Sequence, residues 1–402
     1  GTVSVADVAS RIDPTSVHLR AGDGRGGLDV LEQNYRYDLA GPERILERYL
    51  DTTIDALLEN GDLRSGKLQS FGQGQIVLLS DRGLSMLQRE KIVDLRFPSL
   101  PEGLITRPTL VWDVQSERPG AREVELSYLT NGISWHAEYV AVTNKDDTAA
   151  DLSGWVSVDN RSGAAYPDAR LQLIAGDVHR VQPERPTPRG VMDMRMAGAE
   201  AKVGFEEESF FEYHLYTLPR PTTVRDRETK QISLFPPART GVEKVYEYQP
   251  HRDQKKIRVV LQFENSEENG LGMPLPKGKV RTYKRDSRGG QQFVGEDRID
   301  HTPKDEEVRL GLGNAFDIVP ERTVKNQTRV SDRVHEMTVE TKIRNHKQEK
   351  VTVVVQERFW GDWEVIRSTH PTNKRDAYTA EWSVEVGPDV EEILEFTVRM
   401  RR

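Results

Sequence analysis

Apolar residues recur at every second position over most of this chain. In the segment 122–130, Val124, Leu126 and Tyr128 alternate with charged or polar residues. The same alternation is found in 255–265, 335–345 and 391–400. A period of two places the apolar side chains on one face of a β-strand. Many short segments of this kind, separated by Gly, Asn, Asp and Pro, predict antiparallel sheets that form sandwiches or barrels.

One segment has helical spacing instead. Ile45, Leu46 and Tyr49 follow Pro42, a residue favoured in the first turn of a helix, so we expect a helix over 42–50. The following residues, 51–58, fit either a continued helix or a strand. The segment 66–97 then has the pattern of four short strands with tight turns, which is typical of a small SH3-like barrel.

We therefore predict an all-β chain with three modules. Residues 1–41 and 98–322 are expected to form a central antiparallel β-sandwich, with a mobile loop near 182–204, where Pro, Gly, Ala and Met replace the alternating pattern. Residues 42–97 form the inserted helix and barrel. Residues 323–402 carry several alternating segments and three tryptophans, which suit a small immunoglobulin-like sandwich.

The segment Tyr128–Val140, "YLTNGISWHAEYV", combines a turn signal with aromatic and titratable residues. Asn131-Gly132 between two alternating segments predicts a type I′ hairpin. Trp135 would then face the core. His136 and Glu138 would be neighbours on the opposite face, an arrangement that supports a partly covered outer face more than a catalytic site.

Composition limits the classes of function. The chain has 402 residues, of which 36% are hydrophobic and 30% charged, and its formal net charge is −8. Nucleic-acid binding needs a positive patch, so we expect no nucleic-acid partner. The chain contains no cysteine, which excludes disulfides, thiolate nucleophiles and thiolate metal sites. No apolar run approaches the ~20 residues of a membrane helix, so we expect no transmembrane segment in this chain.

The chain begins with Gly1 rather than Met. We expect a processed start, with any signal peptide upstream of this sequence. Avoidance of cysteine also fits export to the periplasm, the cell envelope or the extracellular space.

The sequence gives little evidence of motifs for catalysis or cofactor binding. "GDGRGG" at 22–27 lacks the lysine of a phosphate-binding loop and precedes an apparent strand, so we interpret it as a hairpin loop and expect no cofactor. The densest titratable segment, 296–305, holds four weak candidates for a metal site: Asp297, Asp300, His301 and Asp305. The alternative is a charged connection whose carboxylates cap turns and pair with Arg298 and Lys304.

Aromatic residues supply a second candidate surface. The segment 208–221 is apolar on both faces, which indicates burial between layers or contact with a partner. The residues that we assign to such an interaction are Phe210, Phe211, Tyr213 and Tyr216. Near the C-terminus, Trp360 and Trp363 flank a turn, where they fit core positions better than a carbohydrate platform.

Several long segments resemble one family. They include "IDPTSVHLR", "ELSYLTNGISWHAEYV", "DLSGWVSVDNRSGAAYPDARLQLIAGDV" and "GDWEVIRSTH", in order from Ile12 to the C-terminus. These residues are similar to the bacterial domain-of-unknown-function family four-one-three-nine, some of whose members are labelled mucoidy inhibitor A-like. The resemblance implies an exported, β-rich protein and carries over no catalytic residues. The chain lacks the coiled-coil region of the mucoidy-inhibitor-like members.

The expected function is that of a non-catalytic exported or envelope protein that acts through its surfaces, with a protein partner or a second copy as its ligand. Exposed sheet edges in such modules can recruit another strand. The alternative is an enzyme or binding module that acts on envelope polysaccharide, which would need a cleft with convergent acids and exposed aromatics. Calcium-dependent assembly through 296–305 is a third hypothesis.

Overall fold

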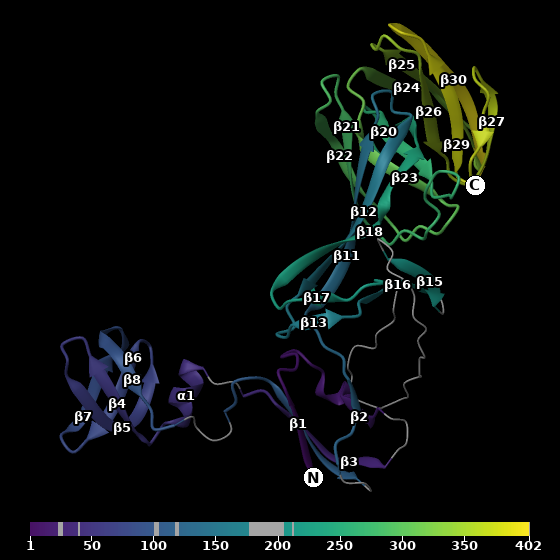
Figure 1. Cartoon of the computed structure of the whole chain (residues 1–402). Coiled ribbons are helices and arrows are strands. Elements are labelled where there is room, and N and C mark those ends of the chain that lie inside the picture. Colours follow the sequence, from purple (N-terminus) through teal and green to yellow (C-terminus); the bar gives the residue numbers. More distant parts are fainter. Residues whose placement is uncertain are drawn as a thin grey trace. The chain divides into compact units, whose positions relative to one another are not determined.

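The computed structural model of the protein describes residues 1–22, 27–38, 41–99, 104–116, 120–176, 205–210 and 213–401 (Figure 1). Strands account for 63% of the structure and helices for 4%, so the all-β prediction is confirmed. The strands form several sheets, and no sheet in the described part closes into a barrel. The chain divides into two compact units, which comprise residues 1–133, 159–167 and 223–228, and residues 134–158, 168–222 and 229–402.

The first unit contains three sheets that match alternating segments of the sequence. One sheet has the order β1-β9-β3, with bounds Thr2–Ala6, Thr109–Ser116 and Leu28–Arg36. A second pairs β10 (Val124–Ser127) with β2 (His18–Ala21), which follows the 3-10 turn η1 (Pro14–Ser16). Leu110 and Trp112 on β9 are fully buried, and they form a core with Val8, Ile12, Val17 and Leu19.

The third sheet of this unit, together with helix α1 (Pro42–Arg48), forms the inserted module. The helix starts at the expected proline. Within the segment 51–58, Thr53–Leu58 form a strand, because Ile54 and Ala56 alternate into the same core as Leu46 of the helix. The sheet has the order β7-β6-β5-β4-β8, with bounds Gly83–Gln88, Gln75–Ser80, Leu63–Gly72, Thr53–Leu58 and Ile92–Arg96, and the 3-10 turn η2 (Arg89–Lys91) joins β7 to β8.

Most of a five-stranded sheet belongs to the second unit. Its order is β18-β12-β11-β21-β22, with bounds Glu228–Gly241, Ala149–Asn160, Ile133–Thr143, Gly278–Arg285 and Gln291–Ile299. Strands β11 and β21 run parallel. Smaller sheets are β13-β17 (Tyr166–Ala169, Thr222–Val224) and β14-β16-β15 (Gln172–Ala175, Tyr213–Thr217, Glu206–Phe210).

Two further sheets pack face to face as a sandwich. The six-stranded sheet has the order β23-β20-β19-β26-β29-β28, with bounds Glu307–Asn314, Arg258–Glu264, Glu243–Tyr248, Val351–Arg358, Thr379–Val386 and Asn373–Lys374. The four-stranded sheet has the order β24-β25-β30-β27, with bounds Ile318–Ser331, Val334–Asn345, Val390–Arg401 and Asp362–Ser368. Trp382 and Phe396 stack between the sheets with ring centroids 4.5 Å apart.

The sandwich takes strands from both sides of residue 322. Tyr246 and Tyr248 of β19 lie in the same buried cluster as Trp382 and Phe396. The predicted boundary between 322 and 323 falls inside strand β24. The division into three modules stays a prediction, and the expected loop near 182–204 lies outside the described residues.

The hairpin predicted at Asn131-Gly132 is wrong. Strand β10 pairs with β2, whereas β11 lies between β12 and β21 in another sheet. The backbone around the turn bonds elsewhere: Asn131 N donates to Arg11 O at 3.0 Å, and Arg161 N donates to Gly132 O at 2.6 Å. Glycine is needed here because φ is +88° and a Cβ would lie 2.6 Å from the Arg161 carbonyl oxygen.

Within the part of the chain that the structure describes, none of the helices has the length and apolar character required to cross a membrane.

Candidate functional site

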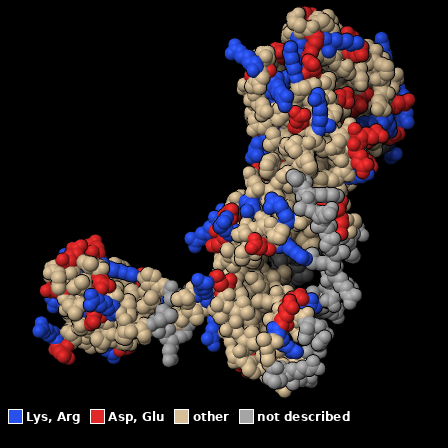
Figure 2. All heavy atoms as spheres, in the orientation of Figure 1, with Lys and Arg blue, Asp and Glu red and all other residues tan. Residues whose placement is uncertain are grey.

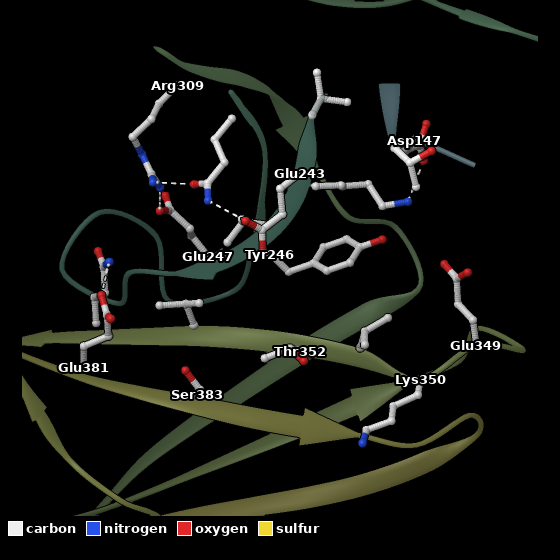
Figure 3. Close-up of a pocket in the computed structure, with 18 of the residues that line it drawn as sticks. Asp147, Glu243, Tyr246, Glu247, Arg309, Glu349, Lys350, Thr352, Glu381 and Ser383 are labelled. Carbon is white, nitrogen blue, oxygen red and sulfur yellow. Dashed lines mark hydrogen bonds and ion pairs between the residues drawn. The ribbon is translucent and has the colours of Figure 1, made fainter. Parts of the chain in front are cut away.

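A groove of about 730 Å³ lies among strands of the six-stranded sheet (Figure 3). Its lining includes the first residues of β19 and β26, whose parallel pairing covers three positions, Tyr246–Tyr248 against Val353–Val355. The loop before β12 forms a further wall. The lining of the groove includes Asp147, Glu243, Lys244, Tyr246, Glu247, Gln262, Arg309, Thr352, Gln356, Arg375 and Glu381.

Alternation along the two strands explains how polar groups reach the groove. In β19, Tyr246 and Tyr248 are core residues, so Glu247 between them faces outward. In β26, Val353 and Val355 are core residues, so Gln356 follows on the outer side. Both outward residues are nevertheless only 4% exposed. Burial of this degree requires hydrogen-bond partners, and the neighbouring strands supply them.

The first half of a polar network centres on the buried Glu247. Arg309 on β23 forms an ion pair with its carboxylate. The same guanidinium donates from Nη1 to Gln262 Oε1 at 2.6 Å, and Gln262 Nε2 donates to Glu243 Oε2 at 2.9 Å. Three neighbouring strands are thereby linked through alternating donors and acceptors.

The second half of the network runs across β26 and β29. Gln249 Nε2 donates to Gln356 Oε1 at 2.7 Å and lies 3.5 Å from Glu247 Oε2. Gln356 Nε2 in turn donates to Glu381 Oε2 at 2.9 Å, and Arg375 is 3.5 Å from the same oxygen. The whole row, from Glu243 to Arg375, is called the groove network below.

The opposite end of the groove is ionic. Asp147 has a left-handed backbone with φ of +56°, and its carboxylate accepts from Lys244 Nζ and Lys284 Nζ, each at 2.6 Å. Burial raises the pKa of Asp147, but the hydrogen bonds and charges of the two lysines outweigh burial and hold the pKa below its ordinary value. In Figure 3 the Tyr246 hydroxyl points toward the side of the groove formed by Asp147 and Glu349.

The groove lining carries charges of both signs, with a small excess of carboxylates. Six carboxylates (Asp146, Asp147, Glu243, Glu247, Glu349 and Glu381) meet four cations (Lys244, Arg309, Lys350 and Arg375). Figure 2 likewise shows Lys and Arg side chains mixed with Asp and Glu over the visible face. Such a lining offers both donors and acceptors without a strong field of one sign, which suits a neutral polar ligand.

Asp147 is poorly suited to act as a general acid. A general acid needs surroundings that keep its proton on at neutral pH, whereas the two lysines bound to Asp147 favour its ionised form.

The four metal candidates do not converge. Asp297 is 3.3 Å from Arg258 Nη2 and accepts from the Gly311 amide at 2.6 Å. His301 Nδ1 accepts from the Lys277 amide at 3.2 Å. Asp300 is exposed and follows β22, and Asp305 lies at a turn with φ of +63°. Among the described residues, no group of three or more His, Asp or Glu is arranged to hold a metal ion.

We predicted that Arg298 and Lys304 would pair with the acids of this segment. The contacts below join the segment 296–305 to side chains outside it. Glu296 lies 3.5 Å from Lys279 and 3.7 Å from Arg281. Lys304 pairs with Glu267 at 2.7 Å. The segment 296–305 is therefore held mostly by cations from neighbouring strands.

The four aromatic candidates have different surroundings. Tyr216 is 1% exposed, and its hydroxyl donates to Pro274 O at 2.8 Å, so it belongs to the interior of the chain. Tyr213 is half-buried. Phe210 ends strand β15, and Phe211 lies outside the described residues. An interaction surface at this place stays a prediction, and Tyr213 is the described side chain that partly reaches the surface.

The pair His136 and Glu138 lies on a polar sheet face. Glu138 accepts from Ser157 Oγ at 3.0 Å and from Gln231 Nε2 at 3.1 Å, and its other oxygen is 3.2 Å from Arg281 Nη1. His136 is 4.0 Å from Glu138. Ser157 donates to the carboxylate rather than to a histidine, so the order of groups differs from that of a nucleophile and its base.

Trp360 and Trp363 differ in how far their side chains are exposed. Trp363 is 7% exposed and donates from Nε1 to Ala377 O at 2.7 Å, whereas Trp360 is 42% exposed.

The sequence pattern did not identify the groove residues as a site. The available signal was Gln356 and Glu357 at the end of an otherwise apolar strand, since buried polar residues in such a strand need partners.

Comparison with known proteins gives a family. A family model described as "Domain of unknown function (DUF4139)" matches residues 124–401, which include every residue of the groove. A search of curated proteins and a search of solved structures found no match to the chain. The match covers more than half of the chain and agrees with the resemblance noted in its sequence, so the chain belongs to the family described as Domain of unknown function (DUF4139).

Proposed function

We propose that the chain is a non-catalytic binding protein of the cell envelope or extracellular space, and that its groove binds a neutral polysaccharide. One observation carries the proposal. The groove network presents a continuous row of carboxylate, amide and guanidinium groups across five strands and the segment before β29, from Glu243 to Arg375.

A hydroxyl-rich chain fits such a row. Every sugar hydroxyl both donates and accepts, so it is best met by donors and acceptors placed side by side. Glu247 and Gln356 are buried and bonded within the protein, which holds the more exposed groups of the network in place before a ligand arrives. Little ordering of side chains is then needed on binding.

The charge of the lining favours a neutral polymer over a polyanion. Four cations are outnumbered by six carboxylates, and Arg309 and Lys244 are already paired with Glu247 and Asp147. A phosphorylated or strongly acidic chain would meet repulsion rather than a positive surface.

Export is supported by composition. None of the 402 residues is cysteine, which fits a compartment in which free thiols are oxidised. An exported binding protein would meet envelope or extracellular polysaccharide directly.

Binding is tested by affinity electrophoresis of the purified chain in gels that contain neutral glucans, with an acidic polysaccharide as a second arm. Thr352 is exposed on β26 inside the groove, so Thr352→Arg introduces bulk into the binding surface without removing a buried group. Thr323→Arg is the matched control, because Thr323 is also exposed, on β24 of the other sheet. We expect retardation of the wild type and of Thr323→Arg by a neutral glucan, and its loss in Thr352→Arg.

Three results would count against the proposal. Equal retardation of both variants would place any binding outside the groove. Retardation by the acidic polysaccharide alone would contradict the charge argument. Release of reducing ends from a bound glucan would show catalysis, and the non-catalytic assignment would then fail.

A further inference from the structure

Among the strands that the structure describes, β7 pairs with β6 alone and so forms an edge with an apolar face. It ends the order β7-β6-β5-β4-β8 (Figure 1). Leu84 and Met86 on its outer side are 69% and 66% exposed. They lie directly opposite Leu79 and Val77 of β6. These four side chains, called the β7 patch below, form a contiguous apolar surface of a kind that marks interaction sites.

The two edges of this sheet differ in charge. Strand β8 carries Asp94 and Arg96, which pair at 2.9 Å along the edge. Strand β7, "GLSMLQ", has neither a charged residue nor a proline. Charges and prolines on an edge strand normally prevent pairing with another chain. The β8 edge therefore has such protection and the β7 edge lacks it.

We propose that β7 pairs antiparallel with β7 of a second copy of this chain, with Ser85 on the two-fold axis. Leu84 then lies opposite Met86 of the second copy, and the two β7 patches join into one apolar surface. Asp81 precedes β7 in the turn and Arg89 follows it at the start of η2, so the two-fold arrangement brings these opposite charges toward each other at both ends of the strand pair.

A second copy fits this surface because β7 and its flanking charges are complementary to the same residues rotated by a two-fold axis. The apolar pair and the two flanking charges are matched by the same strand rotated about the axis, as an isologous interface requires. Arg89 already contacts Glu43 through Nη1 at 2.5 Å, which fixes one side of the guanidinium and leaves its other donors to face Asp81 of the second copy.

The register is tested by cysteine crosslinking, which is direct because the chain has no cysteine of its own. Opposed residues of an antiparallel pair have Cα atoms about 4.5–5.5 Å apart, a separation that a disulfide can span. Under mild oxidation we expect Ser85→Cys to give several-fold more covalent dimer than Val93→Cys on the β8 edge. Equal yields for the two variants would overturn the proposed register.

The interface itself is tested by sedimentation equilibrium of the whole chain. A single strand pair buries little surface, so we measure from about 1 µM to about 1 mM. Met86→Lys and Val93→Lys change side chains of equal exposure, 66%, on opposite edges. We expect dimer in the wild type and in Val93→Lys, and monomer in Met86→Lys. A wild type that stays monomeric throughout, or a Met86→Lys variant that dimerises normally, would refute the proposal.

Discussion

Three buried asparagines hold the ends of strands in the same way. Asn160 and Asn345 are the last residues of β12 and β25, and Asn265 directly follows β20. Each is at most 1% exposed, its Nδ2 lies within hydrogen-bonding distance of three carbonyl oxygens, and its Oδ1 accepts from a backbone amide. Each asparagine side chain thereby provides hydrogen-bond partners for backbone groups in the turn after its strand and in a neighbouring segment.

Removal of one of these side chains should destabilise the chain strongly. Asn345→Ala leaves the carbonyls of Glu349 and Gly387, which Nδ2 contacts at 2.8 and 2.9 Å, without this donor inside the protein. We expect a loss of about 2–4 kcal/mol in the free energy of unfolding, measured by urea denaturation. Asn326→Ala, at an exposed position of β24, is the control and should change stability by less than about 0.5 kcal/mol.

The carboxylate of Asp147 should contribute to stability in a pH-dependent way. Its pKa in the folded chain is lower than the ordinary value of 3.8, so the unfolded chain binds the proton first as pH falls. The stabilisation is complete above that ordinary value and is lost as pH falls through the lowered pKa. In urea titrations between about pH 6 and pH 2, Asp147→Asn should therefore lose less stability than the wild type.

Asparagine at position 147 keeps a residue type that tolerates the left-handed backbone. The matched control is Asp146→Asn, because Asp146 is exposed beside it. Parallel pH profiles for wild type and Asp147→Asn would show that the two lysine contacts do not stabilise the folded chain.

The local sequence pattern predicts well where strands occur. It predicts poorly which strands pair with one another. The alternation of Val259, Leu261 and Phe263 marks β20 correctly, as does that of Leu394, Phe396 and Val398 in β30. Partners are set by contacts far apart in sequence. Strand β11 runs parallel to β21, and β19 runs parallel to β26.

The groove was beyond sequence reasoning for the same reason. It is lined by residues of β19, β20, β23, β26 and β29, and no local pattern shows that these strands are neighbours in one sheet. Its network joins Glu247 to Arg309 and Gln356 to Glu381, residues that are unremarkable until their strands are neighbours. The turn at Gly132 was misjudged because its glycine is required by the Arg161 carbonyl rather than by a hairpin.

Substitution of two glycines should separate backbone strain from close approach. Gly132 and Gly61 have similar φ, +88° and +84°, but a Cβ at Gly61 would meet nothing within 4 Å. We expect Gly61→Ala to lower the unfolding free energy by about 1 kcal/mol, the cost of left-handed backbone alone. Gly132→Ala should lower it by about 3 kcal/mol or more, because the Arg161 segment must also shift. Equal losses in urea denaturation would contradict the role assigned to the Arg161 contact.

At the scale of the whole molecule, stability resides in separate cores. Leu68, Ile76 and Leu78 belong to a core within the inserted module. Trp382 and Phe396 belong to the core of the sandwich, which also includes Tyr246 and Tyr248 from β19. Each core buries its own apolar side chains, so each is expected to open as a cooperative unit.

Hydrogen exchange of a sandwich variant should show where its cooperative unit ends. Trp382 is fully buried and stacked on Phe396, so Trp382→Ala should cost about 3–5 kcal/mol and accelerate amide exchange throughout that unit. Because β19 pairs with β26 and shares its core, we expect faster exchange in 243–264 as well as in 334–401. Leu68→Ala is the control, since it should accelerate exchange in 53–96 and leave the sandwich unchanged. If Trp382→Ala accelerated exchange only beyond residue 322, the C-terminal residues would form a cooperative unit of their own, as the sequence alone suggests.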